Sequence, residues 1–501
     1  MGRTKKFLLN SLSTAIYQVL LMITGFITPL VMLRYYGSEV NGLISSISQF
    51  IVYFNLVEAG LSAAAIYALY KPLAKGDYSE INGVVSAAKK FYFQAGYIFV
   101  SLTLGLAIFY PMFVESGSIS NMDMFLLVLI LGVNGALEFF TLAKYRVILT
   151  ADQKTYIVSI ASMVHIIVNT ILIVILAYMQ VDLVILRFVA LLSIFLRSFI
   201  LMFYVKRKYK YIDFNFEPNF KPLDKRWDAL YLQVLGAIQV GAPIVILTLV
   251  TKDLLLVSVF TIYNLIIGGL RGILGIFKSG LSASFGEVIA KNETKILQKS
   301  YQEFEYIYYL IITCMFFVAF VMIMPFVSIY TNGINDTNYI LPLVGFLFVL
   351  DGLLYSMKNP QGMLVLSAGL FKETRLQATI QGLILIVLGI VLTYKFGLIG
   401  VLVASIISNL YRLIDLLIFV PKKITKLPIR YSAYRVIRVF VLILFMILPL
   451  NFIDFNPQTY FSWFLNSAIL GIYSLIMSLL FGLIFDKEDL FSSIKRFTKI
   501  I

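Results

Sequence analysis

"GLSAAAIYALYKPLAKGD" occupies residues 60–77 of the chain, and "GLSASFGEVIAKNE" occupies residues 280–293. Both stretches begin with Gly-Leu-Ser-Ala and end with Ala-Lys, a small or polar residue and an acid. The first closes the second long apolar run of the chain, and the second closes the eighth. A phrase repeated at this distance predicts a fold built from two copies of one unit.

The composition is that of a protein that crosses a membrane many times. Of the 501 residues, 60% are hydrophobic and 13% are charged, and the mean hydropathy is +0.91. Such a chain is expected to be an all-α polytopic membrane protein. Apolar stretches of about 20 residues predict fourteen transmembrane helices. They lie near residues 10–33, 43–68, 91–114, 123–143, 155–178, 183–205, 229–250, 254–277, 306–329, 339–357, 376–395, 398–420, 438–453 and 461–484.

The net charge of +15 follows from membrane topology. An even number of spans puts both termini on one side, and if that side is cytoplasmic, most of the 41 Lys and Arg residues fall in cytoplasmic loops. This is the positive-inside rule. The runs "KRKYKY" (206–211) and "PKKITK" (421–426) then face anionic lipid headgroups, so the charge does not indicate a nucleic-acid partner.

Two further pairs of similar segments occur in the same order along the chain. "LTADQK" (149–154) is similar to "LSAGLFK" (366–372), and "FLRSFILMFYVKRK" (195–208) aligns with "LYRLIDLLIFVPKK" (410–423). Matches in register predict a duplicated six-helix unit whose copies share one orientation and are related by a pseudo-two-fold axis along the membrane normal. We expect an N-terminal six-helix lobe (1–205), a cytoplasmic linker (206–227), a C-terminal six-helix lobe (228–425), and two additional transmembrane helices with a cytoplasmic tail (426–501).

Several motifs carry a family resemblance that covers nearly the whole chain. They are "VSVFTIYNLI" (257–266), "SGLSASFGEVIAKNE" (279–293), "YTNGINDTNYILP" (330–342), "SAGLFKET" (367–374) and "FGLIGVLVASIISNLYR" (396–412). With twelve spans in two halves plus two more, the chain resembles the Wzx-type oligosaccharide flippases of the multidrug/oligosaccharidyl-lipid/polysaccharide (MOP) exporter superfamily.

The resemblance implies a fold and a function. The fold would be the V shape of the MATE transporters, with the substrate bound between the lobes. The function would be translocation of an undecaprenyl-diphosphate-linked oligosaccharide from the cytoplasmic to the outer leaflet of a bacterial cytoplasmic (inner) membrane. The transported unit would supply O-antigen, capsule or exopolysaccharide assembly. The other partners implied are membrane lipids and the polysaccharide polymerase machinery. No cofactor is implied, apart from coupling to an H⁺ or Na⁺ gradient.

Two rivals belong to the same superfamily, namely lipid II flippases and cation-coupled drug antiporters. Proteins resembling these place acidic residues or arginines in their first helix, and residues 10–33 contain neither. No G-x-x-x-x-G-K-[ST] sequence occurs, so ATP hydrolysis is not expected, and no paired Cys or His ligands suggest a catalytic metal. The external connections are short, so a polymerase or ligase, which would be expected to carry a large external catalytic loop, is a poorer competitor. We therefore predict no catalytic residue and no metal site.

A charged side chain at the centre of a span costs about 2.5–3.5 kcal/mol on insertion scales. The predicted spans contain Glu58, Glu138, His165, Arg187, Arg197, Arg271, Asp351, Arg412 and Asp415. Arg271 is the first candidate for contact with a diphosphate, and Lys278 follows seven residues later on the same helix face. The alternatives are an ion pair of Arg271 inside its own lobe, and a Lys278 side chain that only extends to the inner interface.

Aligning the two repeats places Glu58 on Lys278, so symmetry-related positions carry opposite charges. We predict that Glu58 and Lys278 form a gate that closes the cytoplasmic side and opens when substrate enters. Alternatively, Asn55 or Ser62 satisfies Glu58 locally.

The remaining charges divide into coupling and structural candidates. His165, the only histidine, is a candidate for ion coupling with Glu58 and Asp351, although a packed, hydrogen-bonded histidine is the alternative. Asp351 could pair with Lys358 or with an arginine on a neighbouring helix. Arg197, Arg412 and Asp415 are expected to stabilise the fold, with Arg412 and Asp415 neutralising each other one turn apart. Arg187 is expected to extend to the outer interface.

Neutral polar residues complete the predicted cavity. Polar side chains recur every three or four positions along the first span, which predicts one polar helix face. Its members Tyr17 and Gln18, together with Asn55 and Asn264, are candidates for contact with sugar hydroxyls. Hydrogen bonding between helices is the alternative role for that face.

Overall fold

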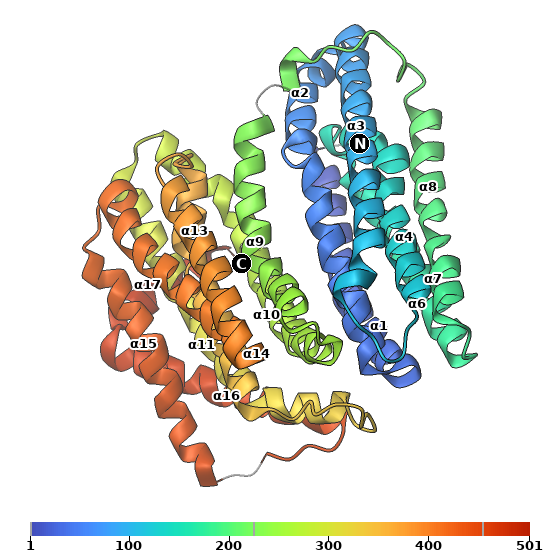
Figure 1. The fold of residues 1–501 in the computed structure, drawn as a ribbon. Helices are drawn as coiled ribbons and strands as arrows, with labels where there is room; N and C mark the ends of the chain where they lie inside the picture. The colour runs from blue at the N-terminus through green and yellow to red at the C-terminus, as the bar shows by residue number, and fades with distance from the viewer. Residues whose placement is uncertain (1–2, 224–225, 453–454, 501) are drawn as a thin grey trace. The chain divides into compact units, whose positions relative to one another are not determined.

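The computed structural model describes residues 3–223, 226–452 and 455–500, and within these ranges the chain is helical and has no strand (Figure 1). The elements are α1 (Arg3–Phe54), η1 (Asn55–Glu58), α2 (Leu61–Lys75), α3 (Tyr78–Phe113), α4 (Asn121–Leu137), η2 (Glu138–Leu142), α5 (Ala143–Ala151), α6 (Thr155–Tyr178), α7 (Leu183–Leu191), α8 (Ser193–Lys208), η3 (Lys221–Leu223), α9 (Arg226–Thr251), α10 (Leu254–Ala290), α11 (Thr294–Tyr330), α12 (Pro342–Met357), α13 (Asn359–Ser367), α14 (Arg375–Val420), η4 (Pro421–Thr425), α15 (Ile429–Ile447), η5 (Leu448–Phe452), α16 (Tyr460–Phe485) and α17 (Lys487–Ile500).

The helices account for the fourteen predicted spans. In the described part of the chain, eleven helical segments are long and apolar enough to cross a membrane. Two of them, Leu8–Lys75 and Arg375–Thr425, each contain two consecutive predicted spans. The tenth predicted span corresponds to α12, which has only 16 residues and is therefore too short to be counted among the eleven. The all-α polytopic fold with fourteen transmembrane helices is thus confirmed.

Two glycines replace loops between consecutive spans. At Gly37 in α1 the backbone adopts φ 86° and ψ 172°, and at Gly397 in α14 it adopts φ 54° and ψ −129°. Residues with a Cβ rarely adopt positive φ, so the backbone conformation at each of these two positions requires glycine. The first span joins the second, and the eleventh joins the twelfth, through a kink in otherwise continuous helix.

The repeated Gly-Leu-Ser-Ala phrase has two different backbone conformations. Gly60 has φ 80° and separates the 3₁₀ turn η1 from α2, and its N–H donates to Oε1 of Gln233 at 3.2 Å. In the second copy α10 is a continuous helix from Leu254 to Ala290. The helix of the second span is therefore interrupted at a position where that of the eighth is continuous.

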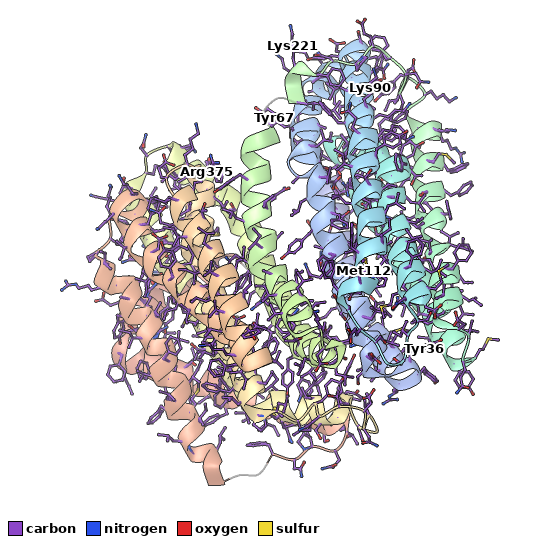
Figure 2. The ribbon with its side chains drawn as sticks, viewed as in Figure 1. Tyr36, Tyr67, Lys90, Met112, Lys221 and Arg375 are labelled. Carbon is purple, nitrogen blue, oxygen red and sulfur yellow. The ribbon has the colours of Figure 1, made fainter. Side chains whose placement is uncertain are left out.

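The chain forms two compact units, residues 1–261 and 262–501, which are described separately. In unit 1, α3 packs along α4, and α6 packs along α1 and α8. Lys90 and Lys221 lie at one end of this unit, whereas Tyr36 lies at the opposite end (Figure 2). The lobe boundaries expected from the repeat, at residues 205, 228 and 425, stay a prediction.

The predicted linker packs against unit 1 over its described residues. Asn82 in α3 donates from Nδ2 to the carbonyl of Tyr211 and accepts from the N–H of Asp213, both at 3.0 Å. The N–H of Asn219 donates to the carbonyl of Gly83 at 3.0 Å. These contacts hold the segment along the end of α3.

Asp152, in the turn between α5 and α6, ties three segments of unit 1 together. Its carboxylate lies 3.3 Å from Nζ of Lys6 and 2.7 Å from Nζ of Lys154, and it accepts from the Tyr209 hydroxyl at 2.5 Å. Burial raises the pKa of Asp152, but the hydrogen bonds and the nearby lysines outweigh burial, so its pKa lies below the ordinary value. The carboxylate therefore stays ionised near neutral pH.

Unit 2 is organised around α11. This helix packs against α12, α15, α16 and α17, and its buried face includes Tyr309, Phe316 and Phe317. The two helices that follow the repeat, α15 and α16, are therefore part of the core of unit 2.

Gly42 provides a test of the packing in unit 1. A Cβ at Gly42 would overlap the backbone carbonyl of Leu254, whereas a Cβ at Gly105 in α3 would meet no atom within 4 Å. Because a backbone carbonyl cannot move aside cheaply, we expect Gly42→Ala to destabilise the protein by about 1–3 kcal/mol. Thermal unfolding of the purified protein in detergent measures this loss. Gly105→Ala is the matched control and should be neutral or stabilising, so equal midpoints for the two variants would contradict the packing.

Candidate functional site

The charged residues of the spans gather into two clusters, one in each unit. In unit 1, which we call the Arg146 cluster, Arg146 joins Glu58, Glu138 and Arg197. Nη2 of Arg146 donates to Oε1 and Oε2 of Glu58 at 2.9 and 3.1 Å, and Nη1 donates to Oε1 of Glu138 at 2.7 Å. Nη2 of Arg197 lies 3.6 Å from the same Oε1. Two cations face two carboxylates, so the cluster is neutral.

Irregular helical turns carry both acids of this cluster. Glu58 ends the 3₁₀ turn η1, and Glu138 begins η2, a π-helical turn that separates α4 from α5. Turns of this kind occur frequently at functional sites, because they shift side chains relative to a regular helix. Sequence analysis missed Arg146, whose position near the end of the fourth span suggested a loop. The available signal was that Glu58 and Glu138 both need a buried cation.

The Glu58 carboxylate has its ion-pair partner inside unit 1. That partner was named neither in the gate prediction nor in its alternative. Its carboxylate is paired with Arg146, and not with the Asn55 or Ser62 considered as local partners, among the hydrogen bonds of the described residues. Lys278 belongs to α10, but its side chain lies outside the described residues. The Glu58–Lys278 gate therefore stays a prediction.

His165 and Arg187 have contrasting environments in unit 1. Nδ1 of His165 lies 3.0 Å from the Ser193 hydroxyl, so the imidazole is hydrogen-bonded between α6 and α8. Arg187 does not extend to the interface as expected: it is only 8% exposed, and its Nε and Nη2 have no hydrogen-bond partner within the described structure. The expectation failed because α7 turns this side chain into the unit, where it packs between neighbouring helices.

Asp351 is the centre of the second cluster, in unit 2. It accepts hydrogen bonds from Nη2 of Arg271 at 2.7 Å, from the Ser405 hydroxyl at 2.6 Å and from Nδ2 of Asn409 at 2.8 Å. These partners come from α10 and α14, while Asp351 belongs to α12. The sequence left the partner of Asp351 open between Lys358 and an arginine, and the ion pair is with Arg271. This is also the intra-lobe pairing considered as the alternative role for Arg271.

Tyr355 holds two cations beside this carboxylate. The Arg271 guanidinium lies 4.4 Å from the centroid of the Tyr355 ring, and Nζ of Lys358 lies 4.5 Å from it. Nζ of Lys358 also donates to Oδ1 of Asn409 at 2.6 Å. We call Arg271, Asp351, Tyr355, Lys358, Ser405 and Asn409 the Arg271 cluster.

The Arg271 cluster differs from the first in its composition, because its members are two cations, Arg271 and Lys358, and one carboxylate, Asp351. The buried Nε of Arg271 has no hydrogen-bond partner among the described residues, so the guanidinium keeps an unused donor. A partly buried cationic group with a spare donor attracts anions, because low polarity strengthens charge-assisted hydrogen bonds.

The other predicted site residues lie on single helices. Tyr17 is half-buried and Gln18 is exposed on α1, and Asn55 is exposed in η1. Asn264 is half-buried on α10, seven residues before Arg271 and therefore on the same helix face. From the polar face of the first span, the Thr14 hydroxyl lies 3.4 Å from that of Ser159 in α6, so part of this face bonds a neighbouring helix.

Arg412 and Asp415 form an ion pair within a single helix, α14. Nη1 of Arg412 donates to Oδ2 of Asp415 at 2.6 Å, one turn along α14. This pair has one charge of each sign.

Comparisons with solved structures identify the fold. The chain superposes on the lipid II flippase MurJ in an inward closed conformation with a TM-score of 0.67 and 17% identity, covering 95% of this chain and 99% of that one. It superposes on a MATE-family multidrug resistance transporter in an inward-facing conformation with a TM-score of 0.65 and 15% identity, covering 84% and 96%. A MOP-superfamily transporter from Pyrococcus furiosus gives a TM-score of 0.50 and 15% identity, covering 85% and 96%.

These likenesses establish that the chain has the fold of MOP-superfamily transporters. No protein-family model matches the sequence, and no curated protein matches it significantly. The sequence prediction of a MATE-like fold is therefore confirmed at the level of the fold.

Removal of Arg146 should be destabilising. Arg146→Met would leave the half-buried Glu58 and Glu138 without this cation, and the loss should be smaller than the cost of breaking a fully buried ion pair on one side, about 3–5 kcal/mol. Thermal unfolding in detergent should show the loss. Adding Glu58→Gln and Glu138→Gln to the same variant should restore much of it, because the unpaired charges are then gone.

Arg207→Met is the matched control for this experiment. Arg207 is an exposed arginine near the end of α8, so its loss should change the unfolding midpoint little. If Arg146→Met behaved like Arg207→Met, the Arg146 cluster would not stabilise unit 1.

Proposed function

We propose that the protein is a flippase that moves an undecaprenyl-diphosphate-linked oligosaccharide from the cytoplasmic to the outer leaflet of a bacterial inner membrane by alternating access. The observation that carries this proposal is the unused Nε donor of Arg271, whose guanidinium lies with Nζ of Lys358 against one tyrosine ring. A diphosphate is the anionic part of such a substrate, and its oxygens would accept from that donor.

Binding would proceed by exchange of partners. Arginine presents a planar fork of donors that suits phosphate oxygens, and lysine contributes a compact charge. A diphosphate that approaches Arg271 competes with Asp351 for the same guanidinium. Ser405 and Asn409 still donate to Asp351 after such an exchange, so the carboxylate keeps partners. Tyr355 holds Arg271 and Lys358 on one ring, which keeps the two cations in position for the substrate.

The two predicted lobes and the neutral polar residues would form the rest of the substrate site. The lobes 1–205 and 228–425, joined by the linker 206–227 and followed by residues 426–501, would enclose the substrate, with both termini cytoplasmic. Tyr17, Gln18, Asn55 and Asn264 would contact the sugar or line its path. The absence of charge in residues 10–33 supports an oligosaccharide over a cationic drug. Polysaccharide polymerase machinery would then receive the product.

Ion coupling is a second part of the proposal. Glu58, His165 and Asp351 are its candidates, with H⁺ or Na⁺ as the coupling ion. Of the three, Asp351 has the most direct link to the substrate, because substrate binding at Arg271 would change the charge next to the Asp351 carboxylate.

Loss of Arg271 should abolish export. Removing a charge-assisted hydrogen bond to a phosphate weakens binding by about 1.5–3 kcal/mol, which is roughly 10- to 100-fold. We expect Arg271→Gln to abolish surface polysaccharide in a host that depends on this protein. The protein level on an immunoblot should be retained, because Ser405 and Asn409 still donate to Asp351. Lys358→Gln should give a smaller loss in the same direction.

The Arg412–Asp415 pair provides the matched control. The double variant Arg412→Gln/Asp415→Asn removes one charge of each sign from the same unit and should retain export. Export at the wild-type level in Arg271→Gln would remove Arg271 from the substrate site.

Lipid II transport is the second candidate, because the likeness to MurJ extends over 95% of this chain. Lipid II is also a diphosphate-linked lipid, so the Arg271 cluster suits both substrates. Reconstituted vesicles distinguish them: we expect translocation of a fluorescent polyprenyl-diphosphate oligosaccharide in preference to fluorescent lipid II. The opposite preference would favour the second candidate.

A further inference from the structure

A groove of about 570 Å³ lies between the N-terminal part of α11 and the middle of α17 in unit 2. We call it the Lys299 groove. Its α11 wall contributes Lys295, Lys299 and Ser300, and its α17 wall contributes Ser492 and Lys495. Its volume falls in the range of small-ligand sites, about 300–1,000 Å³. None of these residues belongs to the Arg271 cluster.

A buried arginine fixes the two walls relative to each other. Arg435 in α15 is 1% exposed, and its Nη1 lies 3.1 Å from Oε2 of Glu305 in α11, while its Nη2 lies 2.7 Å from Oδ2 of Asp489 in α17. The Tyr431 hydroxyl donates to the same Asp489 oxygen at 2.7 Å. In unit 2, whose helices Figure 1 labels, α11 packs against both α15 and α17. The groove is therefore held open by the fold.

The groove is positively charged. Three lysines line it, and the acid among its lining residues, Glu303, is only 6% exposed. Lys295 and Lys299 are one helical turn apart, so both project from one face of α11, and both are exposed. The hydroxyl of Ser300 adds a neutral donor, whereas that of Ser492 already donates to the carbonyl of Asp489 at 3.1 Å. Ammonium groups with a neighbouring hydroxyl are groups that bind phosphate oxygens.

Apolar side chains beside the lysines indicate a lipid as the source of that phosphate. Ile296, which also lines the groove, is 52% exposed, and Phe491, the residue before Ser492, is 52% exposed. Large apolar side chains next to basic ones are typical of helices that lie at a membrane surface. The groove lies where α11 passes from a charged end to an apolar span, which is the depth of lipid headgroups.

We propose that the Lys299 groove binds the phosphate headgroup of an anionic membrane lipid, with Lys295 and Lys299 contacting the phosphate and Ile296 and Phe491 contacting the acyl chains. A lipid bound there would contact α11 and α17 together and would stabilise unit 2. The site is independent of the transported substrate, since it uses neither Arg271 nor its partners.

Lipid titration of the full-length protein tests the site. We expect phosphatidylglycerol, added to the protein in a neutral detergent, to raise the midpoint of thermal unfolding and to remain bound in native mass spectrometry. Each lysine near a bound phosphate contributes a factor of about five in affinity, so Lys295→Gln/Lys299→Gln should weaken phosphatidylglycerol binding roughly 25-fold. Both side chains are exposed, so the lipid-free midpoint of this variant should match that of the wild type.

The pair Lys71 and Lys75 offers a matched control, because these exposed lysines are also four residues apart near the end of one helix, α2. Lys71→Gln/Lys75→Gln should bind phosphatidylglycerol like the wild type, and phosphatidylcholine should give the wild type no comparable shift. Unchanged binding in the Lys295/Lys299 variant, or equal loss in the control variant, would overturn the proposal. An equal shift with inorganic phosphate alone would mean an adventitious ion only, and would also overturn it. A failure of the Arg271 experiments would leave these results unaffected.

Discussion

The cost of holding a charge inside a membrane governs this structure. At three places an ion pair with an arginine offsets that cost, and each time the arginine joins helices that are separate in sequence. Arg146 binds Glu58 and Glu138, Arg271 binds Asp351, and Arg435 binds Glu305 and Asp489. Apolar packing alone cannot specify which helices meet in lipid, because lipid chains are as apolar as the side chains. The ion pairs supply that specificity.

The two charged clusters of the spans are balanced differently. The Arg146 cluster pairs two cations with two carboxylates, whereas the Arg271 cluster has one carboxylate for two cations. The repeats have diverged in backbone as well, since Gly60 interrupts the helix of the second span, whereas α10 is continuous through the corresponding sequence. A duplicated protein whose halves differ in this way can assign anion binding to one half and leave the other neutral.

Sequence predicted the membrane fold well, because hydropathy and the repeated phrases report directly on spans and on duplication. It named Arg271 and Asp351 separately but could not pair them, since Lys358 was an equally good partner by spacing. It missed Arg146 and Arg435 because each lies at the edge of an apolar window, where a basic residue ordinarily marks a loop. The π turn at Glu138 has no sequence signature, yet it sets the position of the acid that Arg146 binds. Residues whose partners come from distant helices are the ones that only the structure could assign.

The contacts of α15 have a consequence for how the protein is made. Arg435 and Arg438 enter the bilayer region with α15, while their partners Asp489 and Asp486 are about fifty residues further along the chain. When α15 is synthesised, Arg435 already has one of its two acids, Glu305 of α11, whereas the partner of Arg438 does not yet exist. The contacts of α15 with α17 can therefore form only after α16 and α17 have been synthesised.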